Sequence, residues 1–147
     1  MYKVIYKETD DWGETTVKVL AKGHEKKKVY NKFLDLLPDK AIHWSMRYDY
    51  WTKETLDKFL EIVPDMDKRP HIIIHTCYPY TFCNEDEGKE EFARYHLHYN
   101  YEMDDLDPVN EPLLTRAQKR QLVKLFKPRW MPSRHTSFEY EFVDTKR

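Results

Sequence analysis

The sequence contains very little glycine, since only Gly13, Gly23 and Gly88 occur in 147 residues. No two of them lie close enough to form a loop that cradles phosphate groups, so the P-loop and the dinucleotide-binding fingerprint are absent. The nucleophile elbow of α/β-hydrolases is absent for the same reason, because Gly-x-Ser-x-Gly needs two glycines around its serine. The scarcity of glycine argues against these enzyme classes and leaves other modes of nucleotide binding open.

Cysteines and long apolar runs are also scarce. Cys77 and Cys83 are too few for the disulfide framework typical of a small secreted domain. No apolar run is long enough to span a bilayer, and residues 1–8 lack the apolar core of a signal peptide. The sequence therefore predicts a cytoplasmic protein that does not associate with membranes. No motif requires a cofactor, and we expect none.

The residues that are present suit one folded domain. Hydrophobic residues make up 40% of the chain and charged residues 35%, a mixture too apolar for a disordered protein. Phe, Trp and Tyr account for 15%, and a few such rings bury enough area to dominate a core. At this length we predict a single domain spanning residues 1–147.

Apolar residues that alternate with polar ones predict several strands. Residues 2–8 and 14–21 alternate on either side of the turn-forming segment 9–13, which predicts an N-terminal hairpin. The same period of two predicts further strands at residues 42–50, 71–75, 94–102 and 138–142.

Apolar residues three and four positions apart predict helices. One spans residues 24–37, where the lysines at 26–28 are expected to form a solvated face, and another follows Thr52. Thr115 and Gln118 match a capping box at the start of a third helix, and residues 85–92 predict a short fourth helix.

The order of these elements predicts the fold class. Helices interleave with strands, but the chain starts with a hairpin and several strands have one polar face. We therefore predict an α+β fold, with a mixed, largely antiparallel sheet of about six strands and three to four helices packed mainly on one side.

Acidic residues gather between residues 84 and 112, where ten acidic and two basic residues give a net charge of −8. The aromatic segment 78–80 precedes them, and tyrosines are favoured at protein interfaces. The two features predict a surface that binds a protein, or a protein–nucleic-acid complex. The residues predicted to form this surface are Tyr78, Tyr80, Glu85, Asp86, Glu87, Asp104, Asp105 and Asp107.

Basic residues gather in residues 113–147, where nine basic and three acidic residues give a net charge of +6. Several fall along one stripe of the helix that starts at Thr115, and Trp130 adds an aromatic ring. Lysine and arginine contacts to phosphate supply most non-specific affinity for nucleic acid, so the stripe predicts direct nucleic-acid binding as an alternative function. Its residues are Arg116, Lys119, Arg120, Lys124, Lys127, Arg129 and Arg134. A further possibility is that the acidic and basic segments neutralise each other.

A second alternative is a metal-dependent enzyme. His96, His98 and Glu102 fall on one face of a predicted strand, because residues two and six apart point the same way. If the predicted strands are neighbours, the histidines on their polar faces could converge on a metal. Those histidines are His43, His71 and His75.

Binding is the function that we favour on sequence grounds. Cys77 and His75 share a strand face, but no third group is evident to orient a nucleophile and its base, so we do not expect an enzyme. We predict a small non-catalytic protein that binds and modulates, most simply inhibits, a larger macromolecule. A viral or mobile-element inhibitor of host machinery has this overall character.

Overall fold

The computed structural model describes residues 1–45, 51–64, 66, 72–77, 93–99, 113–132 and 135–145. The elements in chain order are β1 (Tyr2–Thr9), β2 (Thr15–Gly23), α1 (Lys26–Leu36), α2 (Ala41–Ser45), α3 (Lys53–Ile62), β3 (Ile72–Cys77), β4 (Arg94–Tyr99), α5 (Arg116–Leu125), β5 (Arg129–Trp130) and β6 (Ser137–Asp144).

The chain divides into two compact units. Unit 1 consists of Met1–Asp39 with Leu114–Arg147, and unit 2 of Lys40–Leu113. The α+β class is confirmed, because the described residues form six strands in antiparallel pairs together with four helices. The strands divide between a four-stranded and a two-stranded sheet, where the sequence predicted one sheet. The prediction of a single domain stays a prediction.

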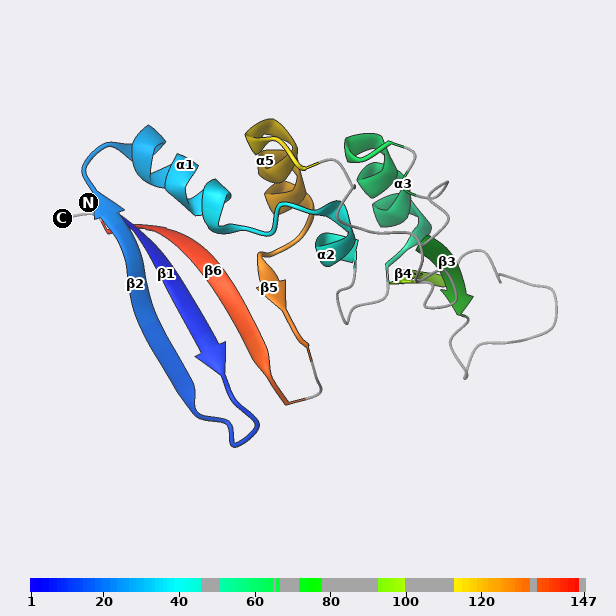
Figure 1. Cartoon of the computed structure of the whole chain (residues 1–147), viewed down its shortest axis with the longest axis horizontal. Helices are drawn as coiled ribbons and strands as arrows, with labels where there is room; N and C mark the ends of the chain where they lie inside the picture. Colours follow the sequence, from blue (N-terminus) through cyan, green and yellow to red (C-terminus); the bar gives the residue numbers. More distant parts are fainter. Residues whose placement is uncertain are drawn as a thin grey trace. The chain divides into compact units, whose positions relative to one another are not determined.

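Unit 1 is built on the four-stranded sheet, in which the strands lie side by side in the order β2, β1, β6, β5 (Figure 1). The predicted N-terminal hairpin is confirmed as β1 and β2. Its turn is held by Asp10, whose carboxylate accepts hydrogen bonds from the backbone N–H groups of Trp12 and Glu14, both at 2.9 Å. Gly13 has a φ of +79°, a left-handed conformation that favours glycine over other residues in this turn.

The two ends of the chain meet in this sheet, since β1 pairs along its whole length with β6. Residues that face each other across the pair point to the same side, so Val4 and Phe142 share a face with Tyr6 and Tyr140. α1 covers part of this face, because the ring of Tyr30 meets that of Phe142 edge-on at 5.1 Å. The core of unit 1 therefore lies between α1 and one side of the sheet.

α1 confirms the helix predicted over residues 24–37. Its apolar residues Val29, Phe33 and Leu34 are buried, while the lysines of the 26–28 run are exposed as predicted. Spacing at three and four places the buried residues on one face, which packs on the sheet. Unit 1 gains its second helix, α5, from the C-terminal half of the chain, where Leu122 is fully buried.

Unit 2 contains α2, α3 and the antiparallel pair of β3 and β4. Thr52 caps α3 as predicted, because its hydroxyl accepts a hydrogen bond from the Thr55 N–H at 3.2 Å. Trp51 exchanges two backbone hydrogen bonds of 2.7 Å with Tyr95 of β4. The Trp51 ring packs on Phe59 of α3 at 5.0 Å, which gives unit 2 its own aromatic core.

The strand predicted over residues 42–50 is wrong at its start, where α2 forms instead. Ile42 and Trp44 are buried on either side of an exposed residue, as in a strand, but Ala41 is buried as well. Buried positions at i, i+1 and i+3 fit one face of a helical turn, and so short an alternation does not discriminate between the two structures. Residues 46–50 and the predicted helix over 85–92 lie outside the described residues.

The chain passes between the units twice, at residues 39–40 and 113–114. Within unit 1, the Leu114 N–H donates to the Asp39 carbonyl at 2.7 Å. Within unit 2, Lys40 and Leu113 form an isolated antiparallel bridge. The two chain segments that connect the units are therefore paired with each other through their backbones. In the part of the chain that the structure describes, no helix is long and apolar enough to cross a membrane.

Candidate functional site

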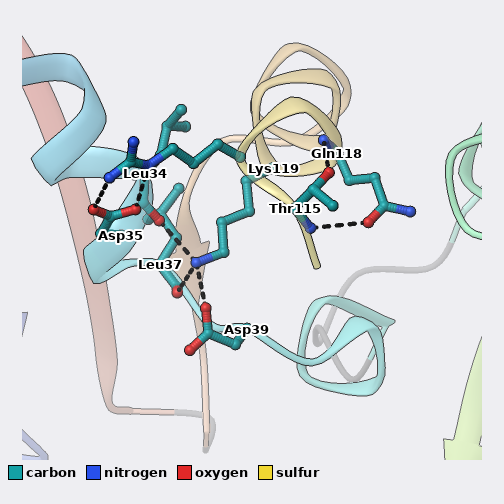
Figure 2. A network of polar contacts seen from close by, with 8 residues as sticks. Leu34, Asp35, Leu37, Asp39, Thr115, Gln118 and Lys119 are labelled. Carbon is teal, nitrogen blue, oxygen red and sulfur yellow. Dashed lines mark hydrogen bonds and ion pairs between the residues drawn. The ribbon is translucent and has the colours of Figure 1, made fainter. Parts of the chain in front are cut away.

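α5 begins with the capping box that the sequence predicts. The Thr115 hydroxyl accepts a hydrogen bond from the Gln118 N–H at 3.1 Å, and the Gln118 side chain accepts one from the Thr115 N–H at 3.0 Å (Figure 2). Two N–H groups at the start of α5 are thereby satisfied. The start of α5, whose first turn carries Arg116 and Lys119, is therefore determined by local sequence.

Lys119 lies elsewhere than the sequence predicted. Instead of projecting from an exposed stripe, its side chain is only 3% exposed. Its ammonium group donates to the carbonyls of Leu34 and Leu37 at 3.0 and 3.1 Å and to the Asp39 carboxylate (Figure 2). These carbonyls belong to the C-terminal end of α1, where helical hydrogen-bonding partners run out. Lys119 therefore fastens α5 to the end of α1 and has no exposed charge to offer a partner.

A second polar contact joins the same two helices at the surface. The Arg116 guanidinium donates two hydrogen bonds to the Asp35 carboxylate, of 2.8 Å from Nε and 2.7 Å from Nη2. This bidentate hydrogen bonding lowers the pKa of Asp35 below its ordinary value, and the arginine charge adds to the effect. The same contact raises the pKa of Arg116. The pair links the C-terminal part of α1 with the first turn of α5.

This pair connects two rows of exposed basic side chains. Lys28 and Lys32 are four residues apart on α1, so they lie on the helix face that also carries Asp35 three residues later. Arg116, Arg120 and Lys124 follow one another at the same spacing on α5. All five cations are exposed. We call them the basic strip: Lys28, Lys32, Arg116, Arg120 and Lys124.

Three cations of the basic strip have no acidic partner among the described residues. Lys28 forms an ion pair with Glu25 at 3.2 Å, and Arg116 is bound to Asp35. Lys32, Arg120 and Lys124 form no such pair within that part of the chain. The sequence prediction included the α5 residues but missed those on α1. Their spacing of four residues was a local signal, whereas the contact that joins the rows is long-range.

The remaining basic residues of the predicted stripe lie apart from the basic strip. Arg129 is exposed in β5, where it pairs with Glu139 of β6, and Lys127 is exposed just after α5. Trp130 is only 6% exposed and stacks on Phe138 at 5.6 Å, so its ring is not available to stack on a base. Arg134 lies outside the described residues.

The predicted metal ligands are brought together in part. β3 and β4 are neighbours, and His75 lies directly opposite His96 with ring centroids 5.0 Å apart. His98 lies two residues further along β4. His43 lies on α2 and not on a strand, while His71 and Glu102 lie outside the described residues. Among the described side chains no group of three possible ligands gathers, so metal binding stays a prediction.

The residues of the predicted protein-binding surface all lie outside the described residues. They are Tyr78, Tyr80, Glu85, Asp86, Glu87, Asp104, Asp105 and Asp107. All of them belong to unit 2, so the predicted acidic surface and the basic strip are parts of different units.

Comparison with protein-family models, with curated proteins and with solved structures found no match to this chain.

Proposed function

We propose that this protein binds a larger macromolecule without catalysing a reaction, and that unit 1 binds nucleic acid. The observation that carries the proposal is the separation of charge between the units. Unit 1 has 17 basic and 10 acidic residues, a net charge of +7, whereas unit 2 has 8 basic and 16 acidic residues, a net charge of −8. A chain with a net charge of only −1 thus contains one strongly basic unit, which attracts a phosphate polymer.

The shape of the basic strip supports a linear polyanion as the ligand. Successive cations on each helix are about 6 Å apart along the helix axis, because each residue of an α-helix rises by about 1.5 Å. The contact between Asp35 and Arg116 continues the row from one helix to the next. Lys119 and the capping box hold the helices in this arrangement without adding exposed charge. Such a row can contact several phosphates of one strand in turn.

Salt dependence tests this proposal. If Lys32, Arg120 and Lys124 each neutralise one phosphate of a duplex, the logarithm of the binding constant should fall against the logarithm of salt concentration with a slope of about −3. Arg120→Ala should weaken binding and make this slope shallower by about 1. Lys18→Ala is the matched control, because Lys18 is an exposed cation of the same unit on β2, away from the strip.

The result is measured by fluorescence anisotropy of labelled oligonucleotides at several salt concentrations. The proposal requires Lys18→Ala to keep the parental slope. It is rejected if no binding occurs at low salt, or if Arg120→Ala and Lys18→Ala behave alike.

A second candidate function is favoured by the net charge of −8 on unit 2. We propose that this unit binds the basic surface of a protein, with carboxylates that speed encounter and tyrosines that supply affinity. A protein that covers a basic, nucleic-acid-binding surface in this way would inhibit it, and a viral or mobile-element inhibitor of host machinery would act so. We propose that the protein acts in the cytoplasm.

A further inference from the structure

A cleft of about 410 Å³ lies in unit 1, where the end of β2 meets the outer face of α1. Lys22 and His24 contribute to its wall from the end of β2 and the connection to α1. Lys28 and Lys32 line it from α1, and Arg116 lines it from α5. Its volume lies within the usual range for sites that bind small molecules. Three residues of the basic strip therefore also line a cleft.

A glycine shapes the wall of this cleft. A Cβ atom placed on Gly23 would lie 3.1 Å from Cγ2 of Val29, which is tighter than ordinary side-chain contact. Val29 is buried in the core of unit 1, so it is constrained by its neighbours. The absence of a side chain at Gly23 lets the end of β2 approach α1 closely, and the cleft lies beside this approach.

The charges that line the cleft are unequally compensated. Its two carboxylates, Glu25 and Asp35, are each bound by a cation, at 3.2 Å from Lys28 and at 2.7 Å from Arg116. Lys22 and Lys32 also line the cleft and form no ion pair among the described residues. With four cations and two carboxylates, the lining carries a net charge of +2. A small anion would therefore be attracted into the cleft.

We propose that this cleft binds a phosphate-bearing nucleotide unit of the nucleic acid that follows the basic strip. This inference rests on the proposed function for the source of the phosphate. Lys32 and Lys22 contact the phosphate from α1 and from the end of β2. The remaining volume accommodates the sugar and base, for which His24 and Asn31 offer hydrogen-bonding groups. The cleft is thus one end of the basic strip.

The experiment uses the full chain labelled with ¹⁵N, with adenosine monophosphate as the probe and adenosine as its phosphate-free counterpart. The backbone amide signals of Gly23 and His24 report on the cleft. Adenosine monophosphate should shift them saturably and adenosine should not. Lys22→Gln should weaken this binding by a factor of about 1.5 to 5, the range for one exposed ion pair. Lys18→Gln, which changes an exposed lysine earlier on the same strand, should leave it unchanged.

An oligonucleotide should shift the same two signals. If neither adenosine monophosphate nor the oligonucleotide shifts them, the cleft is not a phosphate site, even where Arg120-dependent binding shows that the proposed function stands. If adenosine monophosphate binds in the cleft of a protein that binds no oligonucleotide, the phosphate site stands but its assignment to nucleic acid is overturned. Because Lys22 lies outside the basic strip, Lys22→Gln tests the cleft, whereas Arg120→Ala tests the basic strip.

Discussion

Replacement of Lys119 by methionine tests how α1 and α5 are held together. Methionine keeps an unbranched apolar stem of similar length and removes the ammonium group. The Leu34 carbonyl retains one hydrogen bond, from the Leu37 N–H at 3.1 Å, but both carbonyls lose their charged donor. Asp39 also loses its cation, but its side chain is 57% exposed and can be solvated by water. The main loss is therefore that of the hydrogen bonds to the carbonyls at the end of α1.

The size of the effect follows from these contacts. Removal of one partner from a buried ion pair costs about 3–5 kcal/mol, mostly because the other charge is left buried. Asp39 is exposed, so the cost of leaving its charge without a partner is smaller. Each hydrogen bond from the charged ammonium group to a carbonyl contributes about 1.5–3 kcal/mol. We expect Lys119→Met to destabilise the fold by about 3 kcal/mol. For a chain of this size that corresponds to a fall in Tm of about 6–12 °C.

Urea and thermal unfolding followed by circular dichroism measure this change. Lys124→Met is the matched control, because it makes the same substitution at an exposed position of the same helix and should alter stability by less than about 0.5 kcal/mol. Asp39→Asn should have an effect smaller than that of Lys119→Met. Equal stabilities of the parent and Lys119→Met would refute the inference that this ammonium group fastens the two helices.

Three further predictions follow from other contacts and from the sequence. Arg116 lowers the pKa of Asp35, so the pair should stabilise unit 1 fully above the ordinary carboxyl value of 3.8 and lose this contribution as pH falls through the lower native value. Unfolding at a series of pH values should therefore show the stability difference between the parent and Asp35→Asn shrinking in acid, and a constant difference would contradict it. If His75 and His96 bind zinc, elemental analysis after metal supplementation should find one equivalent of zinc per chain. His96→Ala should remove this zinc, and the control His24→Ala should retain it. Less than one equivalent of zinc in the parent rejects the site. If unit 2 binds a basic protein surface, neutralisation of three carboxylates should slow association with a captured partner and reduce its salt sensitivity in surface plasmon resonance, and unchanged association rates would count against that surface. These three changes are Asp104→Asn, Asp105→Asn and Asp107→Asn.

Local sequence patterns predicted the elements whose cause is local. The capping box at Thr115 and Gln118 starts α5 as expected, and Thr52 starts α3, because each cap depends on residues three positions apart. The N-terminal hairpin was predicted from its alternation and the turn between its strands. The same approach failed at α2, where a buried residue next to Ile42 changes the period, and it did not find β5, which has only two residues.

Contacts between distant residues could not be predicted in this way. Tyr2 pairs with Asp144 at the opposite end of the chain, so the order of the four-stranded sheet has no local signature. Lys119 shows the same limit for the candidate site. Its spacing places it with the exposed cations of α5, but carbonyl groups more than 80 residues away take it into the interior. Asp35 likewise joins two basic rows that appear unrelated in the sequence.

Mapping of a bound oligonucleotide on the ¹⁵N-labelled full chain tests the central claim most directly. At low salt, an oligonucleotide should shift the backbone amide signals around Lys32, Arg120 and Lys124, and these shifts should diminish together as salt is added. The signals of α3 in unit 2 should stay in place. Shifts confined to unit 2, or no shift in α1 and α5 at saturating oligonucleotide, would contradict the claim that the basic strip binds nucleic acid.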